Sequence, residues 1–249
     1  YKAIASANAA LDAINEKGNP ASLDPQRGEA LMCRAYNHFV LVNIFSKAYS
    51  PKTSTKDLGI PYMTHLETTV SPEYTRGTVA EVYEKIAADI EAGLPLLNDA
   101  IYTVPKYHFN KKAGYAFAAR FYLYYVKDDK SNYDKAIQYA TVVLTENPTA
   151  MLRDWATVGA LSPNNSIRAT AFINVSEKAN LLLYSTNSSW GRIHGPYGLG
   201  EKFSHNDMIA NKETCKTNSI WGSYSMLYFR IPSYQGMPKV IMGKIAEYF

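Results

Sequence analysis

Two short segments near the C-terminal end combine aromatic rings with amide, guanidinium and imidazole groups. A sugar can stack its C–H face on a flat aromatic ring, while polar side chains nearby bind its hydroxyls. The segment STNSSWGRIHGPY supplies the candidates Asn187, Trp190, Arg192, His194 and Tyr197. The segment WGSYSMLYFR supplies Trp221, Tyr224, Tyr228 and Arg230. We expect these residues to bind a glycan; the alternative is that the large rings fill the core, since tryptophan is largely buried on average.

The sequence contains none of the motifs that would indicate catalysis. It has no GxSxG, HExxH, phosphate-binding loop or dinucleotide-binding fingerprint, and we expect no cofactor. Cys33 and Cys215 have no zinc-type spacing with histidine, so we expect no metal site. Glycoside hydrolysis needs two carboxylates at a defined separation. No evident pair occurs among the acids of the second part, which are Asp154, Glu177, Glu201, Asp207, Glu213 and Glu247. A glycan-cleaving enzyme is therefore the least favoured of three hypotheses.

The composition is that of an ordinary globular protein. The 249 residues are 47% hydrophobic and 19% charged, with a formal net charge of +4. Basic and acidic residues alternate instead of clustering, so we expect no nucleic-acid partner. No apolar run reaches the roughly 18 residues that a membrane-spanning helix needs.

Amphipathic helices are predicted throughout the first 148 residues, because apolar side chains recur there at helical spacing. The predicted helices cover residues 1–17, 25–46, 78–97, 110–127 and 133–146. Their expected buried stripes are Ile4, Ala7, Leu11 and Ile14; Leu31, Ala35, Phe39, Val42 and Phe45; Val82, Ile86, Ile90 and Leu97; Ala113, Ala116, Ala119, Leu123 and Val126; and Tyr133, Ala136, Ile137, Ala140, Val143 and Leu144.

Cap and stop residues mark the ends of these helices. Thr78 and Glu81 form a predicted capping box, and Asp24 before Pro25 is a predicted N-cap. Ser131 or Asn132 is expected to cap the last helix. The expected stop residues are Gly18 and Pro148.

The helices are expected to form tetratricopeptide-type antiparallel pairs. Residues 25–46 would pair with 78–97, and 110–127 with 133–146, and stacking of the pairs would build one core. The segment 48–77 is longer than ordinary connections. It contains the extended piece GIPYMT, and we expect a packed, functional loop.

Residues 149–249 have a different character, rich in Asn, Ser and Gly. ATAFINV and ANLLLYST are predicted as short strands or buried extended segments. KFSHNDMIA is predicted as a short helix, and NSIWGSYSMLYFRIPSY as irregular chain or paired strand.

The order of several segments resembles the SusD/RagB family of bacterial surface glycan-binding lipoproteins. The matching segments, in order, are RGEALMCRAYNHFVLVNIFS, GIPYMT, RGTVAEVYEKIAADIEAGLPLL, KKAGYAFAARFYLYYVKDDKSNYDKAIQYATVVL, ANLLLYSTNSSWGRIHGPY and KIAEYF. No single segment is diagnostic, but their order and spacing are specific and cover nearly the whole chain.

The resemblance implies a mostly α fold. Tetratricopeptide-like hairpins in residues 1–148 would form a right-handed superhelix, packed as one SusD-like domain against an irregular lobe of residues 149–249 with a few short strands. Ligand residues vary within this family, so the glycan-binding candidates rest on the side-chain chemistry described above.

The resemblance also implies a function and a location. The protein would bind oligosaccharide or polysaccharide without cleaving it and deliver it to a SusC-like TonB-dependent transporter, which its helical side would contact. It would face outward on the outer membrane, held only by an N-terminal lipid anchor that this chain lacks. Family members are about twice as long, so we expect an internal fragment.

A helical-repeat scaffold for protein interactions is the alternative hypothesis. The helical pairs could hold a peptide in a concave groove. This hypothesis explains the helices but not why Trp155, Trp190 and Trp221 all lie in the second part. A concave, aromatic-lined surface in the helical part would favour it.

Overall fold

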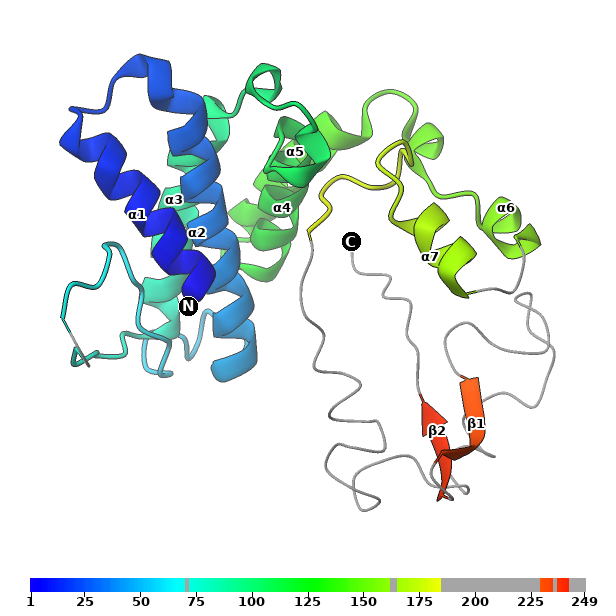
Figure 1. Cartoon of the computed structure of the whole chain (residues 1–249). Helices are drawn as coiled ribbons and strands as arrows, with labels where there is room; N and C mark the ends of the chain where they lie inside the picture. Colours follow the sequence, from blue (N-terminus) through cyan, green and yellow to red (C-terminus); the bar gives the residue numbers. More distant parts are fainter. Residues whose placement is uncertain (70–71, 162–164, 185–228, 235–236, 242–249) are drawn as a thin grey trace. The chain divides into compact units, whose positions relative to one another are not determined.

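The computed structural model describes residues 1–69, 72–161, 165–184, 229–234 and 237–241 (Figure 1). The chain divides into two units, Tyr1–Ala150 and Met151–Phe249, and each is considered by itself. None of the helices in the described ranges is both long and apolar enough to cross a membrane. The packing of both parts as one domain, with a boundary at residue 148, stays a prediction.

The first unit is built from helices, and all five predicted ones are confirmed. Short 3-10 turns cover Ala21–Leu23, Leu94–Leu96, Asp99–Ile101, Pro105–Tyr107 and Pro148–Met151. Helix α2 packs against both α1 and α3, and α4 packs against α5, so the two predicted pairs are present (Figure 1). The mostly helical fold class is confirmed, whereas the right-handed superhelix stays a prediction. The helices are α1 (Lys2–Glu16), α2 (Asp24–Phe45), α3 (Val79–Gly93), α4 (Lys111–Tyr124) and α5 (Ser131–Leu144).

Aromatic rings join α2, α3 and α4 in the core. The Phe121 ring lies 5.7 Å from Phe39 at 76° and 5.6 Å from Tyr83 at 27°. Tyr125 packs against both Tyr83 and Phe121 at 5.5 Å. Offset and edge-to-face contacts of this kind stabilise a core beyond the area that they bury. Several of the chain's tyrosines therefore serve as core residues.

Two glycines let α2 and α3 approach closely. A Cβ atom on Gly28 would lie 2.8 Å from the carbonyl oxygen of Gly93, and one on Gly93 would lie 2.9 Å from the Cβ of Leu31. Both distances are shorter than van der Waals contact, so a side chain at either position would push the helices apart.

The predicted capping box at the start of α3 is confirmed. The Glu81 N–H donates to Thr78 Oγ1 at 3.2 Å, and the Thr78 N–H donates to Glu81 Oε2 at 2.7 Å. These bonds satisfy two backbone groups at the helix start, which have no partner within the helix. Gly18 follows the end of α1 at φ 76°, as expected for a stop glycine.

Two predicted N-caps are wrong. Asp24 is the first residue of α2, and Leu23 is its N-cap, because a 3-10 turn runs directly into the helix. At α5 the N-cap is Lys130, and Asp129 accepts the Ser131 N–H at 3.0 Å. Asn132 instead donates from inside the helix to the carbonyl oxygen of Tyr125 at 2.6 Å.

The buried faces of α2, α4 and α5 also differ from the predicted stripes. Phe45 is 64% exposed, Leu123 57% and Ile137 65%. Tyr133 and Leu144 are exposed as well. Helix α4 instead buries Ala113, Gly114, Phe117, Ala118, Phe121 and Tyr122, and α5 buries Asn132, Tyr139 and Val143. The difference arises because neighbouring helices cover only one side of each stripe.

The second unit contains two short helices that the sequence analysis missed, α6 (Trp155–Ala160) and α7 (Asn165–Phe172). Asp154 caps α6 by accepting the N–H groups of Ala156 and Thr157. The strand predicted within residues 169–175 is wrong, because residues 169–172 end α7. No strand occurs at residues 180–184 either, where Asn180 is buried.

A β-hairpin follows further along the chain. Strands β1 (Phe229–Tyr234) and β2 (Met237–Ile241) are antiparallel, with Phe229 opposite Ile241 and an irregularity between Ile231 and Tyr234. The paired strand predicted near the end of NSIWGSYSMLYFRIPSY is therefore confirmed over its last six residues. The helix predicted at residues 202–210 lies outside the described residues.

Candidate binding site

The long loop between α2 and α3 forms one wall of a cavity in the first unit. The cavity has a volume of about 740 Å3. Glu81, Val82 and Lys85 from the first turns of α3 form the opposite side. Among the described residues of this loop, Ser54, Gly59 and Ile60 are buried, so the loop packs on the helices at these points, and its expected function stays a prediction. The loop residues at the cavity are 60–67 and 72–77.

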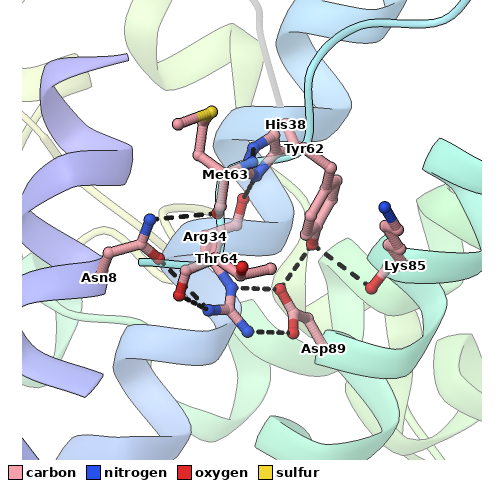
Figure 2. A network of polar contacts seen from close by, with 8 residues as sticks. All are labelled: Asn8, Arg34, His38, Tyr62, Met63, Thr64, Lys85 and Asp89. Atoms are coloured by element: carbon pink, nitrogen blue, oxygen red, sulfur yellow. Dashed lines mark hydrogen bonds and ion pairs between the residues drawn. The ribbon is translucent and has the colours of Figure 1, made fainter. Parts of the chain in front are cut away.

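Three helices each direct two polar side chains toward this loop. The pairs are four residues apart, so both members lie on the same face of their helix. Figure 2 shows most of this polar network, which joins α1, α2 and α3 to residues 62–64. The pairs are Asn8 and Asp12 on α1, Arg34 and His38 on α2, and Lys85 and Asp89 on α3.

A buried ion pair lies at the centre of the network. Arg34 donates from Nε and Nη2 to the two carboxylate oxygens of Asp89, both at 2.7 Å, and the side chains are 11% and 9% exposed. The Tyr62 hydroxyl donates to Asp89 Oδ2 at 2.5 Å (Figure 2). Burial and the Asp89 carboxylate raise the pKa of Tyr62, which therefore stays a donor. Charge-assisted bonds with this two-pronged geometry are the strong ones in proteins.

Side chains, rather than a neighbouring strand, hold the backbone of the loop segment. Asn8 Nδ2 donates to the carbonyl oxygens of Met63 and His65, both at 3.1 Å, and Arg34 Nη1 donates to that of Thr64 at 3.2 Å. The Leu66 N–H donates to an Asp12 oxygen at 2.9 Å. Consecutive backbone groups of the cavity wall are thus bound to α1 and α2.

His38 supplies the remaining bond and is held neutral. Its Nδ1 lies 2.9 Å from the carbonyl oxygen of Arg34, and its Nε2 accepts the Met63 N–H at 3.0 Å. This pattern assigns the proton to Nδ1. The ring stacks on Tyr62 at 3.8 Å, and burial lowers the pKa of His38 to about 4.

The cavity offers groups that suit a hydroxylated ligand. The charged residues Glu67, Glu73 and Lys85 line the cavity. Glu67 accepts a hydrogen bond from the Tyr74 hydroxyl. The Lys85 ammonium lies 5.9 Å from the centre of the Tyr62 ring. Carboxylates and ammonium groups can bind hydroxyls of a ligand as acceptors and donors. Arg76 instead supports the wall by donating to the Gly59 carbonyl oxygen at 2.6 Å. Within the described part of the chain, no cluster of acids, histidines or cysteines could hold a metal ion.

Arg230, one of the nine glycan-binding candidates, lies in β1 opposite Val240, and the other eight lie outside the described residues; all nine stay predictions. These eight are Asn187, Trp190, Arg192, His194, Tyr197, Trp221, Tyr224 and Tyr228. The cavity residues were missed, although the length of the loop and its GIPYMT segment pointed to this region. Polar pairs four residues apart within otherwise apolar helix faces were a further signal.

Comparison with known proteins finds a similar family. Residues 1–123 match the model of a SusD-like family described as starch-binding and associating with the outer membrane. Over these residues, just under half of the chain, the sequence is similar to that SusD-like family. Among curated proteins, none matches the sequence.

Solved SusD-like structures share the fold. A SusD superfamily protein of Bacteroides thetaiotaomicron is 25% identical, with a TM-score of 0.50 over 62% of this chain and 32% of its own. A SusD superfamily protein of Bacteroides vulgatus is 22% identical, with a TM-score of 0.57 over 97% of this chain and 52% of its own. A SusD-like carbohydrate binding protein of the same species is 20% identical, with a TM-score of 0.56 over 74% of this chain and 35% of its own. This chain spans about a third to a half of the length of these structures.

Proposed function

We propose that this SusD-like protein binds a glycan without cleaving it and delivers it to a SusC-like TonB-dependent transporter. The observation that carries the proposal is the match of residues 1–123 to a family described as starch-binding and associating with the outer membrane. The family is described by binding and not by a reaction, which supports a non-catalytic role. A lipid anchor on a segment N-terminal to these residues would hold the protein at the outer face of that membrane.

The cavity beside α3 is one place where the glycan would bind. Its exposed charged side chains, such as Glu73 and Lys85, suit sugar hydroxyls, and its volume of about 740 Å3 falls within the range of ligand sites. The predicted aromatic residues of the second part, above all Trp190 and Trp221, would supply stacking surfaces.

Exposed apolar side chains on the helices support a contact with the transporter. Ile44 and Phe45 are exposed at the end of α2, and Leu123 and Tyr124 are exposed at the end of α4. Large apolar groups exposed together are typical of surfaces that a partner covers. The helical side is therefore the proposed transporter contact.

Retardation in native gels containing polysaccharides tests the glycan-binding proposal. The complete protein should migrate more slowly in gels with soluble starch or another member of a polysaccharide panel than in plain gels. If the second part binds the polysaccharide, Trp190→Ala and Trp221→Ala should restore normal migration. If the cavity binds it, the double variant Glu73→Ala and Lys85→Ala should do so.

Trp155→Ala is the matched control, because Trp155 packs against Phe172 in the second unit and is not a predicted ligand residue. It should leave retardation intact. Failure of every polysaccharide to slow the complete protein would contradict the proposal.

A protein-interaction scaffold is the second candidate function. The described cavity, with Tyr62 and Tyr74 on its wall, belongs to the helical unit, as a groove for a peptide would. Cross-linking the complete protein to the purified transporter separates the alternatives. If the protein cross-links while no polysaccharide binds, the scaffold is favoured.

A further inference from the structure

Apart from the Tyr62 ring, which stacks on His38, the cavity wall between residues 62 and 66 has little apolar burial of its own. Thr64, His65 and Leu66 are exposed, and the buried apolar anchor of this stretch is Ile60. The isolated β-bridge between Leu58 and Thr78 joins residues on either side of the wall and does not include the wall itself. The position of the wall therefore depends on its hydrogen bonds.

Those hydrogen bonds come from three separate helices and meet on five consecutive residues. Asn8 and Asp12 bind the wall from α1, Arg34 and His38 from α2, and Asp89 from α3. The bonds therefore hold the wall in one conformation relative to all three helices. A polar network that is fully satisfied favours one arrangement, because any other leaves buried groups unpaired.

We propose that Asn8, Arg34, His38 and Asp89 form a clamp that positions the cavity wall for ligand, although none of the four lines the cavity. Opening the clamp would release residues 62–66 while the helices stay folded. The effect on ligand binding rests on the proposed function of the cavity. These four are positioning residues, since they act through Tyr62, Met63 and Thr64 (Figure 2).

Two substitutions open the clamp at different points. His38→Phe keeps a ring against Tyr62 but removes the acceptor for the Met63 N–H, and Asn8→Ala removes the donor to Met63 and His65. His38→Gln is the conservative variant, because it restores an acceptor. If His38→Phe does not fold, Asn8→Ala decides the test.

Glu91→Gln is the matched control, on α3, the helix that supplies Asp89 to the clamp. Glu91 accepts bonds from Lys135 at 2.7 Å and Tyr122 at 2.5 Å, so it joins α3 to α4 and α5 and does not touch the cavity. Removing the Glu91 charge should weaken its hydrogen bonds to Tyr122 and Lys135 without moving the cavity wall.

Hydrogen exchange of the complete protein provides the first measurement. The amides of Met63 and Leu66, which donate to His38 and Asp12, should exchange about tenfold faster or more in His38→Phe and Asn8→Ala, as the loss of one such bond predicts. The amides of Ile86 and Ile90 should change little. Exchange should recover in His38→Gln and match the parent in Glu91→Gln. Unchanged exchange of the wall, or a rise shared equally by wall and helices, would overturn the proposal.

Affinity for soluble starch provides the second measurement. The dissociation constant should rise about tenfold in the two clamp variants, and should stay within about twofold in Glu91→Gln. Starch binding that is unaffected by a released wall would also overturn the proposal. If the parent binds neither starch nor any other polysaccharide of the panel, the proposed function alone is contradicted, and the exchange result then decides on the clamp.

Discussion

His38 is a buried imidazole that the fold needs in its neutral form. Its Nε2 accepts the Met63 N–H, and a second proton on the ring would replace that bond with a clash of donors. Burial lowers the pKa of His38 to about 4. The nearby Arg34 charge also lowers this pKa, whereas the Asp89 charge raises it. The side chain therefore links the stability of the loop to pH.

Acid should destabilise the protein through His38. The folded pKa of about 4 lies below the value of about 6.5 for an unfolded chain, so the neutral form is favoured by folding. The contribution of His38 to the free energy of unfolding is complete above pH 6.5 and is lost as the pH falls to 4 and below. The total loss is about 3 kcal/mol. Chemical denaturation at pH 7, 6, 5 and 4 measures it.

His38→Gln is the comparison protein for this experiment, because it keeps an acceptor but does not titrate. Carboxylates with lowered pKa values, such as Asp12 and Asp57, contribute equally to both proteins. The free energy of unfolding should therefore fall more steeply with acid in the parent than in the variant. Parallel pH profiles would show that His38 is not the titrating group.

At the scale of elements, the crossing of α2 and α3 depends on having no side chain at Gly28. Gly28→Ala should destabilise the protein by about 1–3 kcal/mol, because its Cβ would meet the Gly93 carbonyl oxygen at 2.8 Å. This cost should exceed the gain of about 1 kcal/mol from better helix propensity. Thermal or urea unfolding measures the change.

Gly114→Ala is the matched substitution on α4. Its Cβ would meet the end of the Leu97 side chain at 2.5 Å, and that flexible group can move aside. Its cost should therefore be the smaller of the two. Equal losses would mean that backbone contact does not limit the α2 and α3 crossing.

The capping box is a second determinant at this scale. Thr78→Ala should cost about 1 kcal/mol, because the Glu81 N–H loses its acceptor. Thr141→Ala in α5 should be nearly neutral, since the exposed Thr141 hydroxyl donates only to the Ile137 carbonyl oxygen within its own helix. Urea denaturation of both variants gives the comparison, and a similar loss in each would argue against a special role for the cap.

At the scale of the whole molecule, the first unit has a core of its own. Aromatic side chains from α2, α3 and α4 pack together within Tyr1–Ala150. We expect a protein of residues 1–150 to fold by itself, because its helices bury their apolar faces against one another. Circular dichroism should show a helical spectrum and a single cooperative thermal transition. A shorter chain of residues 1–97, without α4 and α5, should lose that cooperativity.

The sequence by itself determined the five long helices, two of their pairings and the capping box, because helical periodicity and local hydrogen bonding act over a few residues. It did not determine α6 and α7, which are too short for periodicity to distinguish from strand. Eight of the nine predicted glycan-binding residues, Trp190 among them, lie outside the described residues, and all nine stay predictions.

Only the tertiary structure decided which part of each apolar stripe is buried. Phe45, Leu123 and Ile137 have the right spacing but face away from their neighbours, because burial depends on what packs against a helix and not on its pattern alone. The same holds for the clamp. Arg34 and Asp89 are 55 residues apart, and each alone is typical of a solvent-facing helical position. Their role follows from the packing of α2 against α3, which brings opposite charges together away from water, where each must have the other as its partner.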